Sequence, residues 1–162
     1  LNPTGKLPTL EDGDLVLWET QAILFYLARK YGANQLWVDS LEQEADLFRW
    51  SLYISNQIEA PALDLMLLTK FAKDGVTEGE KLAQLTAQLD RFIPVLEAHL
   101  GGREFLVGEH LTVADIHGAG VLAWPKLAGY DYSPYPHVAA WLRRILALPS
   151  QKRVRARATA TG

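Results

Sequence analysis

The spacing of apolar residues is typical of β-strands at the start of the chain and of helices in the rest of it. Short apolar runs over residues 7–10 and 15–18 flank the polar segment 11–14, which contains Asp-Gly. This arrangement is typical of a β-hairpin. An isolated two-stranded hairpin is only marginally stable in water, so the pattern indicates that this one belongs to a larger structure.

After the hairpin the apolar residues recur at helical spacing. They predict a helix from about residue 20 to Tyr31, which Gly32 stops. Residues 34–40 are expected to be a linker. Residues 41–73 predict a long helix, bent near Pro61 because a proline ring removes a backbone hydrogen bond.

The next helical pattern covers residues 78–100. Asp74-Gly75 is expected to break the preceding helix, and Gly101-Gly102 to end this one, with a kink or bend at Pro94.

The strongest local signal begins at Thr112. Thr112 and Asp115 have the spacing of a capping box, in which each side chain bonds to the other residue's amide. Leu111 and Ile116 occupy the two positions of a hydrophobic staple. A helix is therefore predicted to start at Thr112.

That helix contains Gly118 and Gly120, each of which costs about 1 kcal/mol relative to alanine. Such glycines are expected where another helix packs closely. Trp124-Pro125 is predicted to end the helix. Pro136 is expected to start another, since proline is favoured at the first helical position. Pro149 should stop that one, with a short basic helix after it.

These elements predict a mostly α fold. We expect residues 1–33 to be part of a thioredoxin-like α/β domain and residues 34–40 to be a linker. Residues 41–162 should form an all-helical bundle domain.

Composition narrows the possible chemistry. Apolar residues make up 49% of the 162 residues and charged residues 22%, a globular balance. There is no cysteine, which excludes a disulfide, a thiolate nucleophile and a cysteine zinc site within these residues. No apolar run is long enough to span a membrane. A cytoplasmic protein is expected.

Charge is distributed unevenly. No acidic residue follows Asp131, although the net charge is −3. The basic residues of this stretch are Arg143, Arg144, Lys152, Arg153, Arg155 and Arg157. Such a segment can contact an anionic partner, but a solvated helix end is the favoured interpretation, and no nucleic-acid partner is expected.

A self-contained active site is not evident. The histidines, His99, His110, His117 and His137, form no H-E-x-x-H pair, so no metal is expected and a structural or surface role is favoured for each. No nucleophile elbow or phosphate-binding glycine loop is present either.

One segment has the character of a binding site. Trp18-Glu19-Thr20 lies where the second strand passes into the first helix. A helix N-terminus holds carboxylates well, Thr20 adds a hydroxyl donor, and Glu19 could hold an ammonium group. Together they would suit an α-amino acid. The alternative is that Thr20 merely caps the helix.

Several spaced motifs carry a family resemblance. They are Asn2-Pro3-x-Gly5-Lys6-Leu7-Pro8-x-Leu10, Glu19-Thr20-x-Ala22-Ile23-x-x-Tyr26-Leu27, Gly108-Glu109-His110-Leu111-Thr112-Val113-Ala114-Asp115-Ile116 and Tyr135-Pro136-His137-x-x-x-Trp141. In this order they resemble a cytosolic glutathione S-transferase, along essentially the whole chain. The overall pattern suggests a bacterial member.

The resemblance implies specific roles for the N-terminal residues. Pro8 would be cis, the backbone of Leu7 would pair with the cysteinyl part of glutathione, and Glu19 and Thr20 would hold its γ-glutamyl group. Thr20 stands where serine is usual. Gly5 replaces a polar residue of several classes, so that contact should be absent.

The resemblance also places the catalytic residue outside this sequence. Family members begin with a strand, a helix and a strand ahead of the part that Leu1 matches, and that segment carries the catalytic Tyr, Ser or Cys. The activity implied is transfer of the glutathione thiolate, with glutathione as co-substrate, to a small electrophile. A non-catalytic interaction module is one alternative, and a glutathione-using lyase, isomerase or dehalogenase is another.

Two further expectations concern the helical domain and assembly. Tyr53 and Trp124 are candidates to line the second-substrate pocket, although core packing would explain both. The resemblance implies a homodimer. The open hairpin edge and the apolar residues of the helix that starts near residue 20 also favour association.

Overall fold

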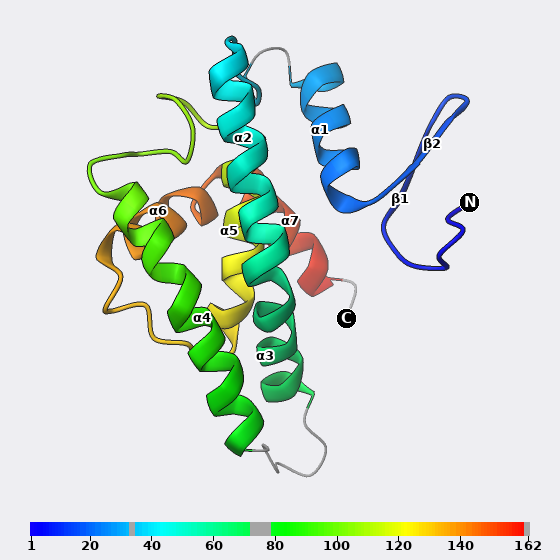
Figure 1. The fold of residues 1–162 in the computed structure, drawn as a ribbon. Helices are drawn as coiled ribbons and strands as arrows, with labels where there is room; N and C mark the ends of the chain where they lie inside the picture. The colour runs from blue at the N-terminus through cyan, green and yellow to red at the C-terminus, as the bar shows by residue number, and fades with distance from the viewer. Residues whose placement is uncertain (33–34, 72–78, 161–162) are drawn as a thin grey trace.

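The computed structural model shows a β-hairpin followed by a helical bundle (Figure 1). It describes residues 1–32, 35–71 and 79–160. The elements in chain order are β1 (Thr9–Asp12), β2 (Leu15–Trp18), α1 (Thr20–Tyr31), α2 (Leu41–Tyr53), the π-helix η1 (Ile54–Glu59), α3 (Ala60–Lys70), α4 (Gly79–Leu100), α5 (Val113–Leu127), α6 (Pro136–Leu146) and α7 (Pro149–Ala160). The expected fold class is confirmed. The predicted break at Asp74-Gly75 lies outside the described residues.

The hairpin is tighter than the sequence pattern predicts. β1 and β2 are antiparallel, with Thr9 opposite Trp18 and Asp12 opposite Leu15. The turn is therefore only Gly13 and Asp14, and Gly13 has the left-handed φ of 60° that glycine adopts readily. The predicted Asp-Gly turn is displaced by one residue, because Asp12 pairs with Leu15 as the last residue of β1.

The long helix expected over residues 41–73 contains a π-helix instead of a simple bend. α2, η1 and α3 follow one another directly, and Pro61 lies in the first turn of α3. In a regular α-helix the ring of Pro61 would clash with the carbonyl of Gln57. The wider turn of a π-helix accommodates that disturbance.

Two other prolines were predicted to end helices, and one of them does not. Pro125 lies inside α5, which continues to Leu127, so the expected end at Trp124-Pro125 was wrong. Helical hydrogen bonding continues past the ring, since the Ala128 N–H donates to the Trp124 carbonyl at 3.0 Å. The other expected stop is confirmed, since α6 ends at Leu146, shortly before Pro149, and the basic helix expected after it is α7, which Pro149 begins.

The core lies between the α2–η1–α3 column, α4, α5 and α6. Its largest fully buried side chains include Leu47, Ile54, Ile58, Leu89, Ile93, Leu122 and Trp141. A Cβ added at Gly118 would lie 2.8 Å from Ile54 Cδ1 and 3.1 Å from Trp141 Cη2, which confirms the close approach predicted there. The same prediction was wrong for Gly120, where a Cβ would meet open space.

No helix in the described part of the chain is long and apolar enough to cross a membrane.

Candidate functional site

A hydrogen-bonded loop precedes β1. The Asn2 carboxamide oxygen accepts from the Thr4 amide at 2.9 Å and from its hydroxyl at 2.8 Å, and the Asn2 amide nitrogen donates to the Lys6 carbonyl at 2.7 Å. The loop leads to Leu7-Pro8, whose peptide bond is cis, as the resemblance implies. Leu7 is 92% exposed, so its main chain is accessible at the start of the hairpin.

The hairpin register brings the two predicted binding segments to one end. Thr9 pairs with Trp18, so Pro8 and Glu19 are the next residues outward on the two arms. Thr20 follows as the first residue of α1. The four predicted residues therefore come from two neighbouring stretches of chain.

Glu19 has an unusual backbone. Its φ is 76° and its ψ 121°, and it is the only non-glycine residue with positive φ in the described part of the chain. A non-glycine residue in such a region costs on the order of 1–3 kcal/mol, and such residues cluster at ligand sites. The strain turns the chain sharply from β2 into α1, and the Glu19 carbonyl accepts the first helical bond from Ile23 at 3.0 Å.

Capping does not explain Glu19 and Thr20. Glu19, and not Thr20, is the N-cap, and no side chain bonds to the first amides of α1. Within the described residues neither the Glu19 carboxylate nor the Thr20 hydroxyl makes a hydrogen bond or an ion pair. Both groups remain available to a ligand beside the open N-terminus of α1.

Asp12 attaches the hairpin to α1. Its Oδ2 accepts from Tyr26 Oη at 2.9 Å, Lys30 Nζ at 2.7 Å and Tyr31 Oη at 2.7 Å. These bonds, that of Lys30 first, lower the pKa of Asp12 to about 2 and raise that of Lys30. The hydrogen bonds of Asp12 thus fix the turn end of the hairpin, and the opposite end of the same hairpin carries Glu19.

A polar cluster that the sequence did not reveal holds the start of α1 against the helical domain. Gln21 Nε2 lies 2.9 Å from His117 Nε2, and His117 Nε2 lies 3.5 Å from Glu59 Oε2. Ser55 donates to that same Glu59 oxygen at 2.7 Å. The hydrogen bonds from His117 and Ser55 lower the pKa of Glu59, while burial opposes them. No spacing rule could have joined these residues, because Gln21 and His117 are far apart in the chain.

An aromatic cluster completes this joint. Phe25 of α1 contacts Trp37 edge-on with ring centroids 5.6 Å apart, and lies 5.1 Å from the ring of Phe48. Ile23 is buried as well. The helical domain therefore covers this face of α1, so its buried residues give less support to association than the sequence pattern suggested.

Two of the remaining histidines bond within the fold. His99 Nε2 lies 2.8 Å from the Leu106 carbonyl, and its ring packs on Trp50 with centroids 4.0 Å apart. His110 Nε2 lies 2.9 Å from the Trp37 carbonyl. Among the described residues no group of three or more His, Asp or Glu side chains could hold a metal ion.

Tyr53 and Trp124 are both half-buried against the core. The Tyr53 hydroxyl donates to the Phe92 carbonyl at 2.9 Å and so links α2 to α4. Trp124 lies on α5. A role in binding a second substrate stays a prediction for both residues.

Comparison with known proteins gives consistent matches. Residues 1–29 match the glutathione S-transferase N-terminal domain, and residues 58–149 match the glutathione S-transferase C-terminal domain. A probable glutathione S-transferase of rice, GSTF2, is 35% identical over 161 residues, which cover 94% of this chain and 74% of the rice protein. GstB of Escherichia coli is 25% identical over 156 residues, and the match covers 95% of this chain and 75% of GstB.

Solved structures match in the same way. Glutathione S-transferase-I bound with lactoylglutathione superposes with a TM-score of 0.86 at 31% identity, covering 96% of this chain and 76% of that one. The relatives named here come from a plant and a bacterium, so a bacterial source stays a prediction.

Proposed function

Because the chain belongs to the glutathione S-transferase family, we propose that it binds glutathione as co-substrate at the end of the hairpin, through Leu7, Pro8, Glu19 and Thr20. The reaction is transfer of the glutathione thiolate to a small electrophile. The observation that carries this proposal is the strained Glu19, whose carboxylate lies unpartnered beside the N-terminus of α1.

The charges of the γ-glutamyl group fit this end of the hairpin. Its ammonium group would pair with the Glu19 carboxylate. Its α-carboxylate would accept from the Thr20 hydroxyl and from the first free amides of α1, where the helix dipole also favours negative charge.

The main chain of Leu7 suits the cysteinyl part. Leu7 lies outside the β1–β2 ladder, so its amide and carbonyl are not used by the hairpin. An extended peptide can pair with such a segment as an added strand. That pairing would direct the glutathione thiol away from the γ-glutamyl site.

We assign no thiol-activating residue within this chain. It contains six tyrosines, and every one of their hydroxyls donates to a group of the fold. The acceptors are Asp12 for Tyr26 and Tyr31, the Phe92 carbonyl for Tyr53, Asp90 for Tyr130 and Tyr135, and the Leu122 carbonyl for Tyr132. None of these six hydroxyls is therefore proposed to activate the thiol. The 162-residue chain by itself is expected to bind glutathione weakly and to show no measurable conjugation.

A binding titration tests the site. Glu19→Ala and Thr20→Ala should each weaken glutathione binding by roughly 1–3 kcal/mol, the range for lost hydrogen bonds to charged groups. An NMR titration is suitable because it detects millimolar affinities. Glu11→Ala, which removes an exposed carboxylate of β1, is the matched control and should leave the affinity unchanged.

Unchanged affinity in the Glu19 and Thr20 variants would remove both residues from the site. Conjugation is followed separately, by absorbance with a chlorodinitrobenzene electrophile. Robust turnover by the 162-residue chain would contradict the placement of the activating residue.

A further inference from the structure

Arg144 of α6 has a buried edge without a hydrogen-bond partner. Its Nε and Nη2 are shielded from solvent, and neither donates to an acceptor in the described part of the chain. These two nitrogens form the edge of the guanidinium group that can bond side by side to two oxygens of one phosphate or carboxylate. A buried cationic donor that lacks an acceptor is costly. The edge therefore indicates an acceptor that the described residues do not supply.

The neighbours of Arg144 explain its position but not this edge. Its guanidinium carbon lies 5.5 Å from the centre of the Phe105 ring, a contact with the ring face that uses no N–H group. Leu100, which ends α4, lines the same hollow as Arg144. The C-terminal end of a helix favours a nearby cation. That attraction leaves Nε and Nη2 without an oxygen at hydrogen-bond distance.

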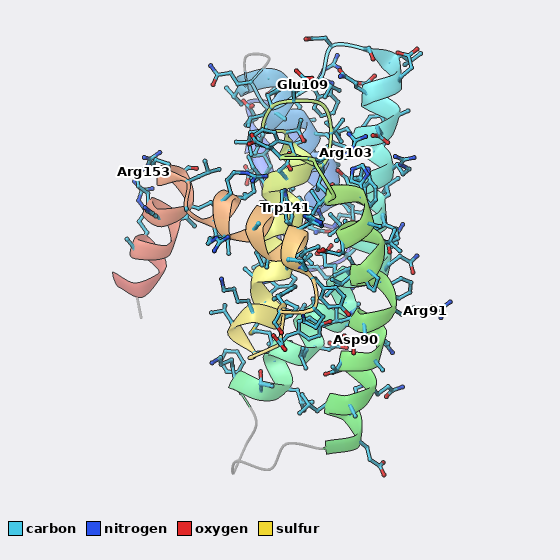
Figure 2. All side chains as sticks on the ribbon, turned by 90° about the vertical axis from the view of Figure 1, so that its left-hand side faces the viewer. Asp90, Arg91, Arg103, Glu109, Trp141 and Arg153 are labelled. Carbon is cyan, nitrogen blue, oxygen red and sulfur yellow. The ribbon has the colours of Figure 1, made fainter. Side chains whose placement is uncertain are left out.

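The hollow beside Arg144 lies between the end of α4, the loop after it and α6. It encloses about 280 Å³, and its lining residues are Leu100, Gly102, Arg103, Glu104, His137, Ala140, Trp141 and Arg144. A Cβ added at Gly102 would meet nothing within 4 Å, so no side chain fills the space there. Figure 2 shows Arg103 just beyond the end of α4, near the part of α6 that carries Trp141. The volume is slightly below the range typical of drug-sized ligands, which favours a small ion.

The charges around the hollow favour an anion. Arg103 is exposed, and neither Arg103 nor Arg144 has an ion pair in the described part of the chain. Glu104, also exposed and unpaired there, brings the opposite charge, but the two guanidinium groups outnumber this carboxylate. His137 adds no free charge, because its Nε2 faces Glu97 Oε1 at 3.9 Å.

We propose that this hollow binds a phosphate group, as inorganic phosphate or as part of a small phosphomonoester. The Nε and Nη2 of Arg144 would donate to two of its oxygens, and Arg103 would donate to a third. Because Nε and Nη2 are shielded from solvent, binding includes a change in the side-chain torsions of Arg144 that turns this edge to the hollow. None of the lining residues belongs to the proposed glutathione site, so the proposal does not depend on transferase activity.

An NMR titration of the chain with inorganic phosphate at constant ionic strength tests the proposal. The Nε–H signal of Arg144 and the indole signal of Trp141 should shift and reach saturation, and the indole signal reports the affinity of the variants. Arg144→Gln should weaken binding by at least about tenfold, as expected for lost hydrogen bonds to a charged group. Arg144→Lys keeps the charge but not the paired donors, and should weaken binding nearly as much.

Two variants of exposed residues test the charge argument without touching the buried group. Arg103→Gln should weaken phosphate binding by up to about fivefold, and Glu104→Gln should strengthen it by up to about fivefold. Both keep the test decisive if replacement of Arg144 unfolds the chain. Unchanged affinity in both variants would overturn the proposal, and so would unchanged affinity in a folded Arg144 variant.

Arg91→Gln is the matched control. Arg91 is an exposed arginine of α4 whose guanidinium carbon also lies over a phenylalanine ring, 5.3 Å from the centre of Phe92. Figure 2 shows it pointing away from the bundle, so this variant should bind phosphate as the parent does. Acetate should bind more weakly than phosphate, and equal binding would overturn the assignment to phosphate. Tighter binding of propyl phosphate would identify the monoester as the ligand, whereas binding of neither phosphate compound would overturn the proposal.

Discussion

Asp115 connects the loop before α5 to both α5 and α6. Its side chain is completely buried. One carboxylate oxygen accepts from the Leu106 amide at 2.8 Å and from the Trp141 indole N–H at 2.9 Å. The other accepts from the amide and the hydroxyl of Thr112, both at 2.9 Å. The helix cap predicted from sequence is thus half of a larger network.

Replacing Asp115 with alanine should be severe. Loss of the cap costs about 1 kcal/mol. The Leu106 and Trp141 donors, both buried, would then lack an acceptor, and each such group costs about 1–3 kcal/mol. We therefore expect Asp115→Ala to lower the free energy of unfolding by about 3–7 kcal/mol. A domain has only about 5–15 kcal/mol in total.

Urea unfolding followed by circular dichroism measures this change, provided that the m-value stays constant. Thr112→Ala isolates the cap and should cost about 1 kcal/mol. Asp64→Ala, an exposed carboxylate of α3, is the control and should change stability by less than about 0.5 kcal/mol. If Asp115→Ala cost no more than Thr112→Ala, the bonds from Leu106 and Trp141 would contribute nothing and the reasoning would be refuted.

Four other outcomes are expected. Gly118→Ala should destabilise the chain by about 1 kcal/mol in thermal or urea unfolding, because the clash with Ile54 exceeds the gain in helix propensity. Gly120→Ala, with open space around it, should stabilise by up to about 1 kcal/mol, and equal effects would contradict the packing argument. The pKa of Asp12 is lowered from 3.8 to about 2 in the folded chain. The ionised Asp12 therefore stabilises the fold above pH 4, and this stabilisation is lost as the pH falls toward 2. Asp12→Asn should remove this part of the acid dependence when the free energy of unfolding is measured against pH. Sedimentation at micromolar concentration should show dimers or larger species, because the described sheet has only two strands and open edges, whereas a monodisperse species near 18.1 kDa would contradict this.

Local signals in the sequence predicted local structure well. The helix start at Thr112 and the start at Pro136 were confirmed, because caps and prolines act on the nearest turn of backbone. The end predicted at Trp124-Pro125 was wrong for a related reason. A proline forbids one particular hydrogen bond, but a helix can continue past it or begin at it.

Contacts between distant parts of the chain were beyond sequence reasoning. Nothing in the pattern indicated that Gln21 would meet His117, or that Glu59 would join them. The four residues of the candidate glutathione site were found through the family resemblance and the hairpin pattern together. The positive φ of Glu19, which supports the proposed binding role, is visible only in the backbone angles.

The π-helix between α2 and α3 affects how well this chain would tolerate a change in length. A π-helical turn holds one residue more than an α-helical turn of similar length. Glu59, which lies beside His117, and Ser55, which donates to Glu59, both belong to this turn, and so do Ile54 and Ile58, which are buried in the core. Insertion or deletion of a single residue could therefore be absorbed here with the bundle intact. The polar contacts that hold α1 and the apolar contacts of the core therefore come from different side chains of the same helical column.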